Sequence, residues 1–77
     1  MKETTLNNIQ CGHAARVVHV KGQGSLKKRI LEMGMVPDAV VTVIRKAPMG
    51  DPIELNVKGY NLSLRKKEAK TIVVQEQ

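Results

Sequence analysis

The sequence predicts an all-β fold, a small β-barrel of about five short strands with one short helix and a helical turn before the last strand. Segments rich in β-branched or alternating apolar residues recur along the 77-residue chain, and such segments are typical of strands. Turn residues separate these segments, and only one stretch longer than a turn has helical spacing. So few and such short strands favour a barrel, because closing the sheet removes its exposed edges.

The length allows a single domain over residues 1–77, with a core that we place at about residues 9–74. A chain of this size buries roughly 60% of the surface that its unfolded form exposes. The first 13 residues are mostly polar, so we expect residues 1–8 to fray, with Leu6 packing onto the body of the domain. Residues 75–77 are expected to fray as well.

Cysteine content and hydropathy indicate where the chain resides. Cys11 is the single cysteine, so no intramolecular disulfide can form, and a reducing cytoplasmic setting is the simpler interpretation. The N-terminus has no apolar signal region, and the longest apolar runs are far too short to cross a bilayer. We therefore expect a soluble protein that does not insert directly into a membrane.

The net positive charge favours an anionic partner, whereas the low aromatic content argues against single-stranded nucleic acid. Thirteen Lys and Arg against seven Asp and Glu give a net charge of +6. Tyr60 is the single aromatic residue, so the platforms on which single-stranded bases stack are missing. An obligatory nucleic-acid partner is therefore not expected.

The first strand is predicted at residues 14–20, AARVVHV, with Val18 and Val20 facing the core and His19 facing outward.

A short helix follows this strand. Ser25 suits the N-cap, and Leu26, Ile30 and Met33 form an apolar stripe at helical spacing. Gly34 stands where a left-handed C-terminal cap belongs. Since so short a helix is unstable alone, its stripe must pack against the sheet.

A second strand is predicted at residues 39–45, AVVTVIR. Its apolar run is nearly continuous, so the periodicity does not predict which side chains of this strand face inward. A loop at residues 47–52 contains two prolines and a glycine that restrict its backbone.

Residues 53–57 and 60–64 alternate apolar and polar side chains and predict a hairpin. Lys58 and Gly59 form its two-residue turn, in which Gly59 needs a positive φ. Residues 65–70 suit one helical turn, and residues 71–74 a last short strand. The hairpin register brings all its apolar side chains to one face by pairing Val57 with Tyr60, Leu55 with Leu62 and Ile53 with Leu64.

The candidate metal ligands are few. Cys11 and His13 lie two residues apart, and His19 is near them in sequence. A zinc site needs three or four ligands, usually with a second pair, and the sequence offers no second pair. Incidental surface residues are therefore the favoured interpretation of Cys11 and His13. For Asp51 we favour a carboxylate that accepts bonds from loop N–H groups. No pattern predicts a catalytic residue or a cofactor.

Three segments resemble the ferrous iron transport protein A (FeoA) family over about residues 9–74. They are RILEMGMVP at residues 29–37, APMGDPIEL at 47–55 and GYNLSLRKKEA at 59–69. The family shows a Leu-rich helix ending in Glu-x-Gly, an Ala-Pro-x-Gly-Asp-Pro loop, and Gly-Tyr followed by alternating apolar residues. All three occur here in that order and at similar spacing.

The resemblance implies an SH3-like barrel without catalytic residues. It also implies a cytoplasmic accessory protein that binds or regulates a bacterial ferrous iron permease, whose cytosolic part is a GTP-binding domain. Through this partner the protein would lie at the inner face of the membrane. Two departures from the family pattern are Asp38, where Gly is common, and the Cys11 and His13 segment. Iron-dependent repressors carry a similar SH3-like domain, but their DNA-binding and dimerisation domains do not fit within 77 residues.

We expect the partner to bind exposed features that local structure holds rigid, since such a surface loses little entropy on binding. Replacing Arg29 by Glu or Met35 by Asp should then weaken binding without lowering the melting temperature. Self-association and the direction of regulation stay open. The predicted surface comprises Lys28, Arg29, Glu32, Met35, Pro48, Met49, Gly50 and Asp51.

Two rival functions stay open beside the adaptor. One is a basic barrel that binds nucleic acid through phosphates, which a salt series on random DNA would reveal by a steep slope. The other is a transition-metal-binding protein, which metal titration of a Cys11→Ser variant would test.

Overall fold

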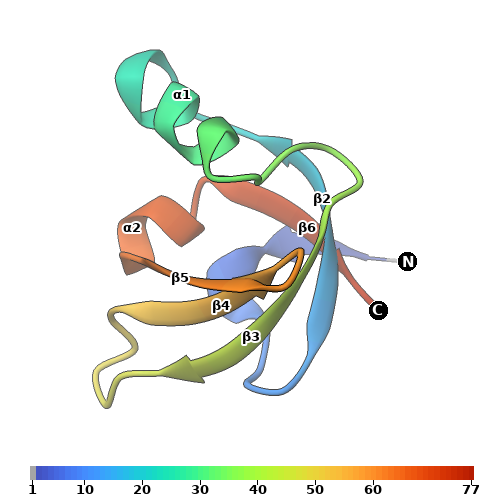
Figure 1. Ribbon diagram of the computed structural model, residues 1–77, viewed down its shortest axis with the longest axis vertical. Coiled ribbons are helices and arrows are strands. Elements are labelled where there is room, and N and C mark those ends of the chain that lie inside the picture. Colours follow the sequence, from blue (N-terminus) through green and yellow to red (C-terminus); the bar gives the residue numbers. More distant parts are fainter. Residues whose placement is uncertain (1) are drawn as a thin grey trace.

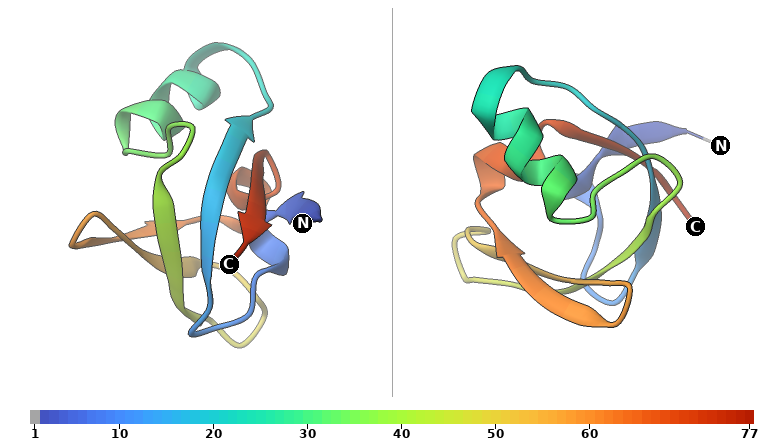
Figure 2. Two further views of the ribbon diagram at one scale, coloured as in Figure 1. Left: turned by 90° about the vertical axis from the view of Figure 1, so that its right-hand side faces the viewer. Right: turned by 45° about the horizontal axis from the view of Figure 1, so that its top comes forward.

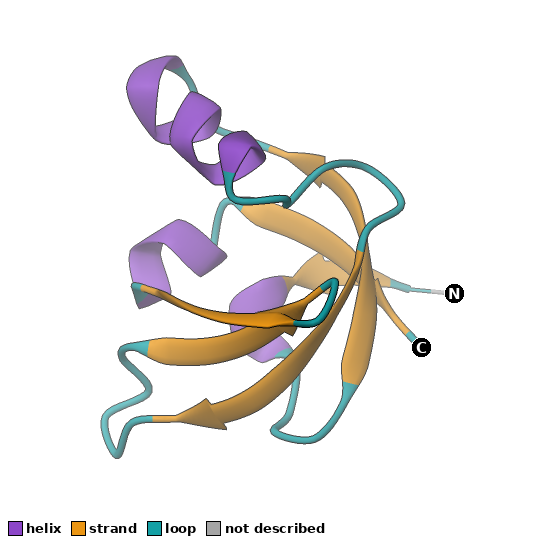
Figure 3. Ribbon diagram, viewed as in Figure 1, coloured by secondary structure: helices purple, strands orange, loops and turns teal. Residues whose placement is uncertain are grey.

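The computed structural model describes residues 2–77, and its main element is one antiparallel sheet of six strands that curls around the core (Figure 1). The strand order is β1-β6-β2-β3-β4-β5, and two short α-helices lie on one side of the sheet (Figure 3). In chain order the elements are β1 (Glu3–Thr5), the 3-10 helix η1 (Leu6–Asn8), β2 (Ala14–Val20), α1 (Gly24–Glu32), β3 (Val40–Lys46), β4 (Ile53–Val57), β5 (Tyr60–Leu64), α2 (Lys66–Ala69) and β6 (Ile72–Glu76).

The predicted all-β fold is confirmed, with six strands instead of about five. The two outer strands of the sheet are β1 and β5, so the curl seen in Figure 2 leaves two sheet edges. The 3-10 helix η1 packs against α2 and β6. The helical turn predicted before the last strand is α2.

Both chain ends belong to the sheet, so the prediction that residues 1–8 and 75–77 fray is wrong; Met1 lies outside the described residues. In β1, Thr5 pairs with Val73 of β6. Because β6 lies between β1 and β2, it pairs along both sides. These partners are almost a whole chain length apart, and local composition carries no signal of such pairing.

The segment that leads into the first long strand also contributes to the core. Leu6 and Ile9 are fully buried. At the other end of the chain, the Gln77 N–H donates to the Ala14 carbonyl at 3.0 Å.

β2 contains a register shift that changes which side chains face inward. Val17 and Val20 are buried, Val18 is half-buried and His19 is exposed. The pairing of β2 with β6 shifts between Val17 and His19. An extra residue at such a bulge interrupts the alternation of side chains. The outward direction of His19 is confirmed, whereas Val18 does not reach the core.

β3 faces inward with Val41 and Val43, which resolves the face that the sequence left open. Val40 and Ile44 point to the other face, where they are 46% and 39% exposed.

The predicted β4–β5 hairpin is confirmed with its register. Val57 pairs with Tyr60, and the pairs along the strands follow as predicted. Lys58 and Gly59 have φ angles of 51° and 89°. Positive φ at both turn residues is the type I′ geometry, whose twist matches that of the flanking strands.

The helix α1 is confirmed, although it begins at Gly24 with Gln23 as its N-cap rather than Ser25. Its apolar stripe packs as expected, since Ile30 is fully buried and both Leu26 and Met33 pack partly buried against the core.

The C-terminal end of α1 forms a Schellman motif. Gly34 has a φ of 101°, and its N–H donates to the Leu31 carbonyl at 3.0 Å. The Met35 N–H reaches the Ile30 carbonyl at 3.4 Å. In this motif the residue after the glycine packs against the last turn of the helix. Met35 is accordingly 0% exposed, so the prediction of an open Met35 on the partner surface is wrong.

Tyr60 of β5 holds this cap in place. Its hydroxyl donates to the Met33 carbonyl at 2.6 Å. A Cβ atom added at Gly34 would lie only 2.8 Å from the same hydroxyl oxygen. The end of α1 is therefore anchored to an edge strand, and the glycine leaves the space that this contact needs.

Candidate interaction site

The residues predicted to bind a partner lie in two separate places. Lys28, Arg29 and Glu32 are exposed on α1, whereas residues 48–51 belong to the loop between β3 and β4. Figure 1 places α1 at the top of the long axis and this loop at the bottom, with α2 between them. The buried Met35 joins neither group. The predicted single surface is therefore interrupted by α2.

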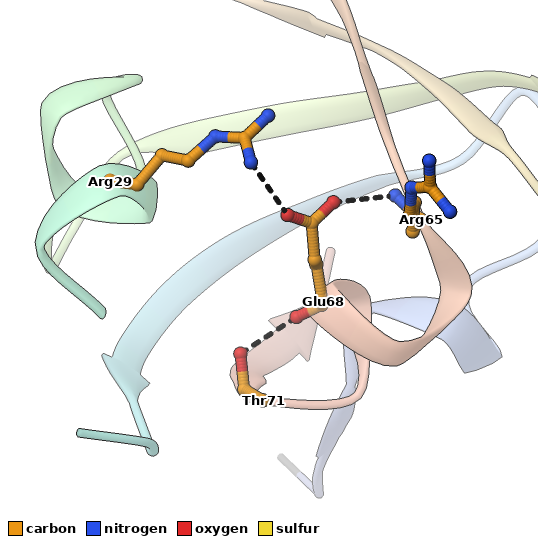
Figure 4. A network of polar contacts seen from close by, with 4 residues as sticks. All are labelled: Arg29, Arg65, Glu68 and Thr71. Atoms are coloured by element: carbon orange, nitrogen blue, oxygen red, sulfur yellow. Dashed lines mark hydrogen bonds and ion pairs between the residues drawn. The ribbon is translucent and has the colours of Figure 1, made fainter. Parts of the chain in front are cut away.

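A buried carboxylate joins the two helices (Figure 4). Glu68 of α2 is 5% exposed, and its Oε1 accepts the backbone N–H of Arg65 at 2.8 Å. Its Oε2 lies 3.7 Å from a guanidinium nitrogen of Arg29 on α1. The Glu68 carbonyl accepts the hydroxyl of Thr71 at 2.7 Å. The Arg65 N–H and the Arg29 guanidinium are the partners of the carboxylate charge, and a buried carboxylate without partners is strongly destabilising.

This contact gives Arg29 a structural role that the sequence did not reveal. Its side chain is 67% exposed, so it is accessible to a partner, yet its charge faces the buried Glu68. Replacing Arg29 by Glu would bring two carboxylates together at the junction of the helices. We therefore expect this substitution to lower stability, contrary to the sequence-based expectation.

The loop at residues 47–52 is held by two backbone hydrogen bonds and one bond to a side chain. The Ala47 N–H donates to the Pro52 carbonyl at 3.0 Å, and the Gly50 N–H donates to the Ala47 carbonyl at 2.7 Å. Asp51 Oδ1 accepts the backbone N–H of Lys66 at 3.1 Å. Asp51 thus binds a backbone N–H as expected, but the N–H belongs to the start of α2 rather than to the loop. The tip of this loop presents Met49, which is 86% exposed.

The candidate metal ligands are not brought together. Cys11 is exposed and unpaired with another cysteine, and His13 Nδ1 lies 2.6 Å from Glu76 Oε2 at the end of β6. Over residues 2–77, no three His, Cys, Asp or Glu side chains are close enough to hold a metal ion. The partnership of His13 with Glu76 was missed because the last residues were expected to fray.

A shallow surface hollow of about 430 Å³ lies along α1, lined by Gly24, Lys27, Lys28, Leu31 and Glu32. Its exposed surface is mostly apolar, although three of its five lining residues carry a charge.

A model of the FeoA domain matches residues 4–76. The chain belongs to the FeoA domain family. This confirms the resemblance seen in the sequence and connects the chain with ferrous iron transport.

Proteins similar to this FeoA domain agree with the assignment. The chain is 41% identical, over 91% of its length, to a Fe(2+) transport protein A/Fe(2+) transporter FeoB fusion protein of Porphyromonas gingivalis. It spans 8% of the length of that relative. The structure of a FeoA-like protein from Clostridium acetobutylicum is similar with a TM-score of 0.90 and 38% identity, covering 99% of this chain and 88% of that one.

The SH3-like fold is confirmed by a further member of the family. FeoA of Stenotrophomonas maltophilia, solved in complex with zinc and described as a prokaryotic SH3 domain protein, has a TM-score of 0.84 at 29% identity. The match covers 94% of this chain and 89% of that one. Within residues 2–77, neither helix of this FeoA domain has the length and apolar character needed to cross a bilayer.

Proposed function

We propose that this FeoA domain is a non-catalytic accessory module of ferrous iron uptake, which binds or regulates a ferrous iron permease through protein–protein contacts. The observation that carries the proposal is the Porphyromonas gingivalis relative, in which a transport protein A segment and a FeoB transporter share one chain. A covalent link keeps two domains at high effective concentration. The fusion therefore supports a contact between the corresponding domains when they are separate chains.

The proposed partner is the GTP-binding cytosolic domain of the permease. The module accordingly acts in the cytoplasm, at the inner face of the membrane, where its partner holds it. No obligatory cofactor is part of this proposal.

The contact that we assign to the permease is the loop at residues 48–51. Met49 at its tip is the most exposed of the large apolar side chains among the described residues. Methionine adapts its shape to a partner, and apolar anchors that become buried supply most of the energy of an interface. The hydrogen bonds of the Ala47 N–H and of the Asp51 carboxylate hold the loop before binding, so little entropy is lost.

Lys28, Arg29 and Glu32 of α1 are the other exposed residues of the predicted surface. They present charge rather than an apolar anchor, and Arg29 already faces Glu68. We therefore place the protein contact at the loop rather than at α1.

The test is a titration of the purified cytosolic domain of the permease with this protein, with and without guanine nucleotide. Met49→Gln keeps the length of the side chain but makes it polar, and it should weaken binding about tenfold, which corresponds to about 1.4 kcal/mol. The melting temperature should stay close to that of the wild type, since Met49 is almost fully exposed.

Val40→Thr is the matched control, because Val40 is an exposed apolar residue of β3 and Thr has nearly its shape. It should leave the affinity within about twofold of the wild type. Equal losses in both variants would place the contact elsewhere. Failure of the wild type to bind under any nucleotide condition would overturn the proposed function.

A further inference from the structure

The positive charge of this protein is concentrated in α1 and in residues 65–70, which comprise α2 and its two cap residues. Lys27, Lys28 and Arg29 outnumber Glu32 on α1, and residues 65–70 contain four cations beside Glu68. These two segments therefore account for five of the six net positive charges. The rest of the chain has six cations against five acids and is nearly neutral.

The fold places these segments beside each other. Arg29 on α1 lies 3.7 Å from Glu68 on α2, and Figure 1 shows the two helices on the same side of the sheet. Glu68 is buried, and the partners of its carboxylate are Arg29 and the Arg65 N–H rather than a lysine. We define the basic helical face as the exposed lysines of these segments, Lys27, Lys28, Lys66, Lys67 and Lys70.

Among the described residues 2–77, no acidic side chain forms an ion pair with these lysines. Over residues 2–77, the ion pairs with acids involve His13, Arg16, Arg29 and Arg45, and none involves a lysine. Uncompensated like charges held on neighbouring helices raise the local potential and attract anions. The charge of the basic helical face is thus available to bind an anionic partner.

The shape of this face suits a broad anionic layer better than a groove or a base. Lys27 and Lys28 are consecutive on a helix, so their side chains diverge by about 100° and cover a wide arc instead of one stripe. Helix α1 also stands at one end of the long axis (Figure 1). Five of the seven cations in the two segments are lysines, which are mobile point charges, whereas arginine forms the planar forks used to bind nucleic acid. Tyr60, the one aromatic residue, already uses its hydroxyl on the Met33 carbonyl.

We propose that the basic helical face binds the anionic headgroups of a lipid bilayer. Clusters of four to eight cations on or beside a helix are typical of proteins that bind acidic lipids. Leu31 supports this assignment, because it lies among Lys27, Lys28 and Glu32 in the shallow hollow on α1 and gives the face a small apolar centre. Binding is reversible and electrostatic, without insertion of a helix. This proposal does not depend on the permease contact.

The test is co-sedimentation of the purified protein with vesicles of phosphatidylcholine, with and without phosphatidylglycerol, at low and at physiological salt. The wild type should bind only the phosphatidylglycerol vesicles, and salt should weaken the binding. The double variant Lys28→Glu/Lys67→Glu should reduce the partition coefficient at least about tenfold.

The control is Lys2→Glu/Lys58→Glu, which changes the net charge equally at exposed positions outside the two helices. It should retain most of the binding. An equal loss in both variants would mean that net charge alone attracts the protein and would overturn the assigned face. No binding of the wild type at low salt, or stronger binding to duplex DNA that is lost in the same helix variant, would also overturn it. Melting curves of both variants verify that each is folded.

Discussion

The β4–β5 hairpin and the pair of helices are held in position by different kinds of contact. In the hairpin, neighbouring segments pair through a two-residue turn, and each apolar side chain meets its partner directly across the strands. The helices are positioned by contacts between distant parts of the chain, such as Arg29 with Glu68 and Tyr60 with Met33. The hairpin therefore resists change through many similar pairs. The helices, besides their apolar packing, depend on a few specific polar contacts.

The largest effect is expected at the cap of α1, where Met35 is fully buried. Met35→Asp would place a carboxylate without a partner in the core, so we expect a loss of at least about 3 kcal/mol in the free energy of unfolding. Met35→Leu keeps the apolar volume and should cost less than about 1.5 kcal/mol. Denaturant unfolding measures both. A folded Met35→Asp variant with wild-type stability would show that this cap is not part of the core.

Gly34 and Gly59, which both have a positive φ, provide a direct comparison of the helix cap and the hairpin turn. Gly59→Ala should cost about 1 kcal/mol through its left-handed backbone alone, since nothing lies near its Cβ position. Gly34→Ala should cost about 2 kcal/mol, because its Cβ also displaces the Tyr60 hydroxyl.

Thermal melts of the two glycine variants and of Tyr60→Phe measure the difference. In the Tyr60→Phe background the extra cost of Gly34→Ala should largely vanish, since the hydroxyl oxygen is gone. Equal costs of the Gly34 and Gly59 variants in the wild-type background would mean that the Tyr60 contact contributes nothing.

A smaller effect is expected where the helices meet. Arg29→Glu should lower stability by about 1 kcal/mol, since it sets a second carboxylate against the buried Glu68 while Arg29 itself is largely exposed. Arg29→Gln removes the attraction without adding repulsion and should cost less. Adding salt should narrow the gap between the two variants in a denaturant titration. A gap that is absent at low salt would indicate that Arg29 does not interact with Glu68 in solution.

The hairpin, the length of α1 and the Gly34 cap could all be predicted because their signals are local. Alternation over residues 53–64 and a Lys-Gly pair specify one register. The burial of Met35 was also within reach, since a glycine cap is commonly followed by an apolar residue that packs back onto the helix. The expectation of an exposed Met35 took account of the glycine but not of this contact, and it was therefore wrong.

The candidate site was harder to predict than the fold. Met49 and its rigid loop follow from the prolines and Gly50, and the bonds at Ala47 and Gly50 agree with that. The separation of this loop from α1 could not be predicted from the sequence, because α2, which lies between them, comes from a later part of the chain. The sequence shows three basic clusters, at residues 27–29, 45–46 and 65–67. Only the fold brings the first and the last together, while Arg45 pairs with Glu54.

The strands β2 to β6, the hairpin register, the cap of α1 and the family motifs follow from the sequence, since each depends on residues a few positions apart. Only the fold shows that the chain ends pair as β1 and β6, that Glu68 is buried against Arg29, and that the two basic helical segments lie beside each other. These features join residues that are tens of positions apart. Which distant segments meet depends on how the whole sheet curls, and the local pattern of apolar and polar residues does not encode that choice.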